Sequence, residues 1–473
     1  MLLITLTNTF SVTRKQKEVM DFTTFHNIIA GQRRSSSTEY SGTSPITGSL
    51  LWSAPVATSE DVDDAVAAAR LAFPSWAARS YKERTQLLNQ FADRYLEHSG
   101  QFIELLKSET GRDTQASAIE VLWAANWLRY PAQYEIPEKS HEDDEKFVTI
   151  KYEPLGIIAA ICPWNFPLML AIGKIAQAVA TGNCIIVKPS PFTPYSALKL
   201  VELAQEIFPA SVIQVLGGND QLGPSLVNHP RINKISFTGS ASSGKKVMRA
   251  AGNNVAIIFD DVDVQKTALQ TAQALWFNAG QVCLNARRLY IHESIYESFV
   301  EALVTATNEI STDLASNVGP IQNDMQFQMI KRCVEECRNK GYRLSTGELE
   351  HQSAAGLLFH PVIIDNPPND ASVVQDEHFG PVVSCKPFSS LENVVELAND
   401  TLGGLDAIIW SKDVKLAESI ADRLEVGTVF INGPPKPDPF VPFGGHKQSG
   451  TGVEYGLEGV LGCCQIKAIQ RYK

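Results

Sequence analysis

One cysteine, Cys283, lies at the centre of the stretch WFNAGQVCLNARRLY, among small, amide and apolar residues and without a carboxylate nearby in the sequence. A free cysteine in such a setting is often structural, because it packs like a small hydrophobic side chain. The alternative is a covalent nucleophile, which can add to an electrophilic carbon and then carry the product as a thioester. That second interpretation requires supporting groups elsewhere in the chain.

An amide that could support such chemistry belongs to Asn165, in the segment CPWNFP. It follows an expected buried strand and stands between a tryptophan and a Phe-Pro pair that would fix the loop. A side-chain amide in this place can polarise a carbonyl oxygen. Asparagine is also a common turn and capping residue. Only the other motifs of the chain can distinguish between these two roles.

The segment FTGSASSGKK, residues 237–246, places glycines and serines between an expected strand and an expected helix. Backbone N–H groups and the helix dipole favour an anion there, which predicts a phosphate site. Gly239 to Lys245 also match the first part of a P-loop, but Lys246 stands where that motif needs Ser or Thr to hold magnesium. A P-loop NTPase is therefore a remote alternative.

The secondary-structure elements that position these residues alternate between strands and helices. Buried strand patterns such as NCIIVKPS are followed by helical patterns such as YSALKLVELAQEIF, and the alternation resumes after Asn254 as far as GTVFING. Such alternation predicts right-handed βαβ units and a doubly wound parallel sheet. No repeat or low-complexity linker divides the chain. We therefore expect an α/β protein with interwoven domains.

The charge and composition of the chain exclude some classes of binding partner. The 473 residues carry a net charge of -11, which argues against nucleic acid or an anionic membrane and favours a small-molecule substrate. No apolar run approaches the length of a membrane helix.

Eight thinly spread cysteines indicate a reducing compartment, so we expect the cytoplasm. The start of the chain has no acidic residue before Glu18, which leaves organelle targeting as the alternative. Cys333 and Cys337 lack a second ligand pair at zinc spacing, so no metal is expected.

Six segments in order and at near-family intervals resemble the aldehyde dehydrogenase superfamily: PWNFP, VKPSPFTP, FTGS, FNAGQVC, DEHFGPVV and PFGGHKQSG. The resemblance extends from about His26 to about Gln470. It implies a Rossmann-type cofactor domain, an α/β catalytic domain, a small β oligomerisation hairpin and a homodimer or homotetramer. The corresponding ranges are 26–131 and 151–251 for the cofactor domain, 252–448 for the catalytic domain, 132–150 and 449–473 for the oligomerisation region, and 1–25 for an N-terminal extension.

The resemblance also implies residue roles. Cys283 becomes the nucleophile that oxidises an aldehyde to an acid through a thiohemiacetal and a thioester, and Asn165 forms the oxyanion hole with the Cys283 backbone N–H. Lys174 and Glu454 occupy positions of a proton path. The residues implied to bind NAD are Trp164, Lys188, Gly239, Ser240, Gly244, Glu377 and Phe379. Pro191 stands where many NAD-preferring relatives carry a carboxylate, so NADP is left open.

One departure from the family bears on catalysis. Between GKKVMRAA (244–251) and NNVAIIFDDVDV (253–264) relatives carry a strand like VTLELGG, whose glutamate activates the water that hydrolyses the thioester. About a dozen residues are missing here, roughly one strand with its turns, and RAAGNN offers no carboxylate. We therefore expect the hydrolytic half-reaction to be impaired unless Lys174 or Glu454 relays the proton. A catalytically inactive homologue, or the product of a mis-spliced gene model, is the alternative.

Overall fold

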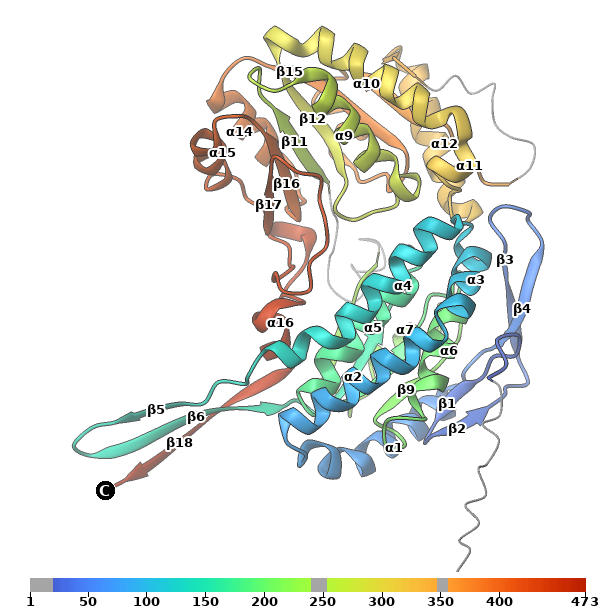
Figure 1. Cartoon of the computed structure of the whole chain (residues 1–473), viewed down its shortest axis with the longest axis vertical. Coiled ribbons are helices and arrows are strands. Elements are labelled where there is room, and N and C mark those ends of the chain that lie inside the picture. The colour runs from blue at the N-terminus through green and yellow to red at the C-terminus, as the bar shows by residue number, and fades with distance from the viewer. Residues whose placement is uncertain (1–19, 240–252, 347–355) are drawn as a thin grey trace, which may run out of the picture.

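The computed structural model describes residues 20–239, 253–346 and 356–473, and Figure 1 shows two large sheets, each covered by helices, with an arm that projects from the body. Over these residues the strands form sheets of six, seven, three and two strands. The two large sheets position the candidate site.

The first large sheet confirms the expected doubly wound arrangement. Its order is β10 (Lys234–Phe237), β7 (Ile157–Ile161), β8 (Cys184–Lys188), β9 (Ile213–Val215), β1 (Asn27–Ile29) and β2 (Gln32–Arg34). The first four strands are parallel, and the hairpin of β1 and β2 adds to β9 in the antiparallel sense. Every residue of β8 and of the helices α5 (Pro167–Ala180) and α6 (Tyr195–Ala204) is buried. Burial on both faces explains why these segments read as continuous apolar runs.

Three helices at the N-terminal end of this unit begin at side chains that satisfy free backbone N–H groups. Thr58 and Asp61 form a capping box at α1 (Ser59–Ala77), and Ser80 and Glu83 form another at α2 (Tyr81–Glu97). The helices α3 (Ser99–Thr110) and α4 (Thr114–Arg129) follow, the latter capped by Asp113. The hairpin of β3 (Glu39–Thr43) and β4 (Leu50–Pro55) forms the two-stranded sheet.

The second large sheet has the order β13 (Arg343–Leu344), β14 (Val362–Asp365), β15 (Val382–Phe388), β12 (Ala286–His292), β11 (Asn254–Ile258), β16 (Asp406–Trp410) and β17 (Thr428–Ile431). All neighbours are parallel except β13 with β14. Successive side chains of β11 point to opposite faces of this sheet, where they enter two separate hydrophobic cores. Ala256 and Ile258 pack with α9 (Val264–Trp276), α10 (Tyr296–Ile310) and α12 (Asp324–Asn339), whereas Val255 and Ile257 pack with α14 (Leu391–Asn399) and α15 (Val414–Ala421).

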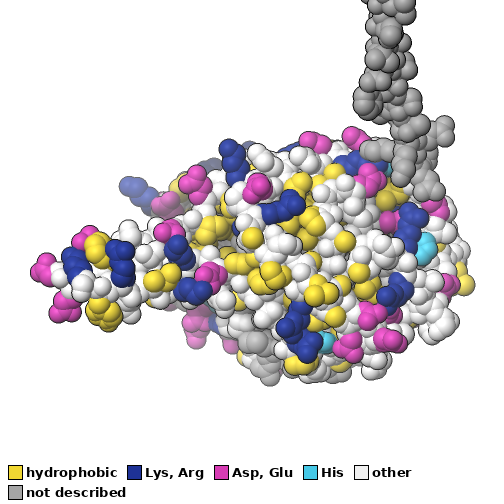
Figure 2. Space-filling model, turned by 90° about the horizontal axis from the view of Figure 1, so that it is seen from below, with side chains coloured by type: hydrophobic (Ala, Val, Ile, Leu, Met, Phe, Trp, Pro, Cys, Tyr) yellow, Lys and Arg dark blue, Asp and Glu magenta, His cyan; other side chains and the backbone are white. Residues whose placement is uncertain are grey.

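The arm is an antiparallel sheet of β5 (Lys139–Glu142), β6 (Lys146–Pro154) and β18 (Cys464–Tyr472). The two longer strands pair along their whole length, from Cys464 opposite Pro154 to Tyr472 opposite Lys146. Charged and apolar side chains alternate along its surface (Figure 2), and β18 leaves Ile466 and Tyr472 each 68% exposed at a sheet edge. Among the described helices, none is long and apolar enough to cross a membrane.

Candidate active site

Asn165 contacts the loop that carries Cys283, between the two large sheets. Asn165 follows β7 of the first sheet, and Cys283 precedes β12 of the second. The Asn165 side chain is buried and its Nδ2 donates a hydrogen bond to the backbone oxygen of Gln281 at 3.1 Å. The fold therefore brings together two residues that lie more than a hundred positions apart in the sequence.

The loop that carries Cys283 has an unusual backbone. After α9 ends, Asn278, Ala279 and Gly280 adopt left-handed φ angles of 53°, 51° and 68°. A Cβ on Gly280 would lie 2.4 Å from the Gly380 carbonyl oxygen, so only glycine fits there. Strained conformations of this kind persist where surrounding contacts fix them, and they cluster at functional sites.

Buried side chains hold this loop in place. The Asn254 Nδ2 donates to the Cys283 carbonyl oxygen at 2.6 Å. The Arg287 guanidinium donates to the Gly380 oxygen at 3.0 Å and to the Val282 oxygen at 3.3 Å. These bonds fix the backbone on both sides of the thiol, as a nucleophile of defined geometry requires.

The environment of the thiol keeps it protonated at neutral pH. Cys283 retains some exposed surface, yet desolvation raises its pKa to about 12, and the charges of Asp406 and Glu377 act in the same direction. Arg287 opposes them only in part. Because the thiolate is the reactive form, this cysteine needs a proton acceptor when it reacts.

An aromatic pair lies beside this loop. The rings of Trp164, after β7, and Phe379, before β15, meet edge to face with centroids 5.5 Å apart. The Arg287 guanidinium carbon lies 5.9 Å from the centre of the Phe379 ring. Phe379 itself has a left-handed φ of 50°, and Gln326 Nε2 donates to its carbonyl oxygen at 3.2 Å. Two of the residues implied to bind NAD are thus brought together.

Other residues implied to bind the cofactor gather at the carboxyl ends of the parallel strands of the first sheet. Lys188 ends β8, and Gly239 comes two positions after β10. This edge is where open α/β sheets bind their ligands. Lys188 is buried, which lowers its pKa, and its Nζ donates to the Pro189 oxygen at 3.3 Å. Ser240 and Gly244, like the expected helix SGKKVMRAA, lie outside the described residues.

Lys174, which is buried, and Glu454, which is half-buried, form an ion pair beside β10. The Lys174 Nζ also donates to Ser236 Oγ and Thr238 Oγ1, both at 2.9 Å. Desolvation alone would raise the pKa of Glu454, but the Lys174 charge and the hydrogen bonds from Lys174 and Ser236 outweigh it and lower the pKa. The two predicted relay residues are therefore neighbours of each other.

Sequence reasoning missed a carboxyl group in this region. Asp406, the first residue of β16, is fully buried, and its Oδ2 accepts a hydrogen bond from Asn254 Nδ2 at 3.0 Å. The only available signal was an acidic residue at the head of the apolar segment AIIW. Within the described parts of the chain, no group of three or more His, Cys, Asp or Glu residues is arranged to hold a metal ion.

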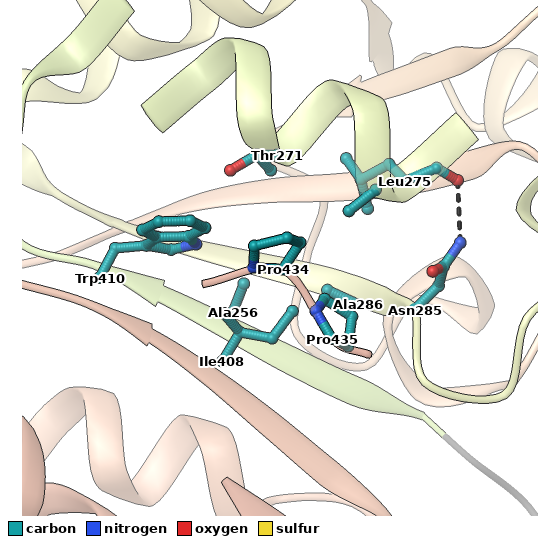
Figure 3. A pocket seen from close by; sticks show the side chains of 10 residues that line it. Ala256, Thr271, Leu275, Asn285, Ala286, Ile408, Trp410, Pro434 and Pro435 are labelled. Atoms are coloured by element: carbon teal, nitrogen blue, oxygen red, sulfur yellow. Dashed lines mark hydrogen bonds between the residues drawn. The ribbon is translucent and has the colours of Figure 1, made fainter. Parts of the chain in front are cut away.

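A separate, small apolar pocket lies between α9, β11 and β16. Pro434 and Pro435 close it, and Figure 3 shows the hydrogen bond from Asn285 Nδ2 to the Leu275 oxygen at its edge. Its lining contains neither Cys283 nor Asn165 nor any acidic or basic side chain. The pocket is therefore distinct from the place where the nucleophile lies.

Comparisons with known proteins show which family this chain belongs to. The profile of the "Aldehyde dehydrogenase family" matches residues 32–469. "Aldehyde dehydrogenase LUC3" of Fusarium sp is 52% identical over 467 residues, covering 96% of this chain and all of that protein. The P. syringae AldA indole-3-acetaldehyde dehydrogenase, in complex with NAD+ and IAA, superposes with a TM-score of 0.91 at 29% identity, covering 95% and 97% of the two chains. An NAD+ complex of a Bacillus cereus aldehyde dehydrogenase gives 0.90 at 30% identity, covering 95% and 96%. This chain therefore belongs to the aldehyde dehydrogenase family.

Proposed function

We propose that this protein oxidises an aldehyde to a carboxylic acid with NAD(P)+, and that Cys283 is its nucleophile. The observation that carries the proposal is the hydrogen bond from Asn165 Nδ2 to the Gln281 backbone oxygen, because it ties an amide donor after the first sheet to the loop that carries the Cys283 thiol before the second. The family supplies the substrate class, an aldehyde. The first large sheet would bind the cofactor, and the second would carry the reacting thiol.

Each part of the site has a defined task in this reaction. Once the Cys283 thiol has lost its proton to solvent water, its sulfur forms a bond to the aldehyde carbon, and the carbonyl oxygen gains the electron pair of its π bond. The Asn165 amide and the Cys283 backbone N–H would stabilise that oxyanion. After loss of hydride a thioester remains on Cys283, and water releases the acid and regenerates the thiol.

The residues that the family resemblance assigns to the cofactor fit a dinucleotide by their chemistry. Lys188 offers an ammonium group, and Gly239 leaves the backbone open after a strand because it has no side chain. Glu377 offers a carboxylate to the ribose hydroxyls, and Trp164 and Phe379 form an aromatic surface. Bound nicotinamide supplies the hydride acceptor. The related structures from P. syringae and Bacillus cereus contain NAD+. Because Pro191 contributes no carboxylate, NADP is the alternative cofactor.

A rapid-mixing experiment tests the proposal and separates its half-reactions. The protein is mixed with cofactor and a reactive aldehyde, reduced cofactor is followed by absorbance, and the acyl adduct on Cys283 is sought by intact-mass analysis. A burst of about one equivalent per site followed by slow turnover would mean that acylation works and hydrolysis is impaired. Steady turnover would mean that another group replaces the missing glutamate. No reduced cofactor at all would favour the inactive homologue.

We also expect a homodimer or homotetramer. The exposed edge of β18 carries Ile466, Ile469 and Tyr472, and a sheet edge with apolar side chains is a surface that another chain can cover. Light scattering at micromolar concentration should give a mass of at least two chains. Ile469→Lys should weaken association, and Leu71→Lys, also exposed but on α1, serves as the control. A monomeric mass for the parent protein would contradict the prediction.

A further inference from the structure

Hydrolysis of an acyl group on Cys283 requires a proton acceptor for water. The family resemblance places that group on a strand which is missing here. The segment SASSGKKVMRAAG, residues 240–252, contains no Asp, Glu or His, so it cannot supply the acceptor. The group must therefore come from another part of the chain.

The order of the second large sheet places Asp406 close to Cys283. The parallel strands β12, β11 and β16 are consecutive neighbours, so their amino ends lie at one edge of the sheet. Cys283 precedes β12, Asn254 begins β11 and Asp406 begins β16. The Asn254 Nδ2 donates to the Cys283 carbonyl oxygen at 2.6 Å and to Asp406 Oδ2 at 3.0 Å. A single amide nitrogen thus bridges the carboxyl group and the nucleophile's backbone.

The Asp406 carboxyl group is also poised to take up a proton. Its second oxygen, Oδ1, is buried and has no hydrogen-bond partner among the described residues. Burial raises the pKa of Asp406 well above its usual range, with Arg287 opposing this shift and Glu377 adding to it. A buried acid with one unpartnered oxygen beside a nucleophile is characteristic of a functional carboxyl group.

The other acidic groups near the site are less suited to this task. Glu454 is paired with Lys174, and its lowered pKa makes it a weak proton acceptor. Asp406 and Glu377 are the carboxylates whose charges raise the pKa of the Cys283 thiol. The family resemblance assigns Glu377 to the nicotinamide ribose. Of these two carboxylates, Asp406 therefore remains to accept a proton from water.

We propose that Asp406 is the general base that hydrolyses the acyl group on Cys283, an inference that rests on the proposed function of this cysteine. The ionised carboxylate takes one proton from water as the water oxygen bonds to the thioester carbon. The carbon–sulfur bond then breaks and its electron pair goes to the Cys283 sulfur. The carboxylic acid departs, and the proton held by Asp406 passes to the thiolate, which restores both groups.

The test isolates deacylation from hydride transfer. The full chain is acetylated on Cys283 with p-nitrophenyl acetate, excess reagent is removed, and the acetyl adduct is followed over time by intact-mass analysis. Asp406→Asn preserves an oxygen that can accept from Asn254 but removes the base. Asp365→Asn is the matched control, because Asp365 is also buried in this sheet but ends β14 at the opposite edge and accepts from Tyr296.

The Asp406→Asn adduct should persist on the order of 10²- to 10⁴-fold longer than that of the parent, whereas the Asp365→Asn adduct should not. Hydroxylamine, which needs no base, should remove the acetyl group equally fast from the parent and from Asp406→Asn. Equal lifetimes in parent and Asp406→Asn would overturn the inference while leaving Cys283 as nucleophile. An adduct resistant to hydroxylamine would also overturn it, because the substitution would then have closed the site. Failure of the parent to acquire an acetyl group on Cys283 would instead reject the proposed function.

A second measurement needs no variant. In the parent protein a general base makes the deacylation rate rise with pH and then level off once the base is ionised. We expect that plateau to begin above the ordinary range of aspartate. The charged groups that act on Asp406 are Arg287 and Glu377. A rate that keeps rising about tenfold per pH unit, as for direct attack by hydroxide, would contradict a role for Asp406.

Discussion

Cys283→Ala should lower aldehyde oxidation by on the order of 10³-fold or more while cofactor affinity stays near that of the parent. The substitution removes one sulfur atom from a loop whose backbone is held by Asn254, Arg287 and Gln281. The residues implied to bind NAD do not depend on that sulfur. Formation of reduced cofactor measures the first effect, and quenching of protein fluorescence by NAD measures the second.

The control for this variant is Cys464→Ala, because Cys464 is likewise a free, half-buried cysteine but begins β18 in the arm. It should oxidise aldehydes at the rate of the parent. Activity of Cys283→Ala within about tenfold of the parent would reject this cysteine as the nucleophile. Loss of cofactor binding along with activity would point to a collapsed loop, and a thermal melt would reveal it.

Arg112→Ala should reduce the free energy of unfolding by about 3–5 kcal/mol, because it leaves a buried carboxylate without its partner. Arg112 and Glu120 are 2% and 0% exposed and form an ion pair. The other Glu120 oxygen accepts from the backbone N–H groups of Leu168 and Met169, both at 3.0 Å. The pair therefore holds the start of α5, directly after Asn165, so activity should fall together with stability.

Urea denaturation of parent and variant measures this loss. Arg129→Ala is the matched control, because Arg129 pairs with Asp93 on the surface, where the two side chains are 34% and 72% exposed. Such a surface pair contributes less than about 1 kcal/mol. If both variants lost the same small amount, the buried pair would not be important for the fold.

The strand and helix patterns were sufficient to predict the parallel core, because segments such as NCIIVKPS can be buried on both faces only in a covered sheet. The approach of Asn165 to Cys283 could be predicted only through the family resemblance, since no local pattern links residues so far apart. The hairpin of β1 and β2 was not predicted to join the first sheet. Its strands have three residues each, too short to give a periodic signal.

Asp406 could not be found from the sequence for a different reason. Its proximity to Cys283 depends on β11 lying between β12 and β16, and strand order is a property of the whole sheet. Arg287 was missed likewise, because an arginine beside an apolar strand reads as a surface residue. In the fold its guanidinium is buried and donates to the backbone oxygens of Val282, in the Cys283 loop, and of Gly380. The roles of all the residues implied to act in catalysis or to bind the cofactor, Ser240 and Gly244 among them, stay predictions.

The pairing of β18 with β6 sets the order in which the protein can be completed during synthesis. Lys146 and Gln470, which bond to each other in the arm, are 324 residues apart. A ribosome adding about 5–20 residues per second needs tens of seconds to cover that interval. Throughout that time β6 has emerged with Phe147 and Ile150 but lacks its longest partner. The nascent chain therefore presents an open strand to chaperones and to neighbouring nascent chains, and the yield of native protein should depend on how well that strand is shielded.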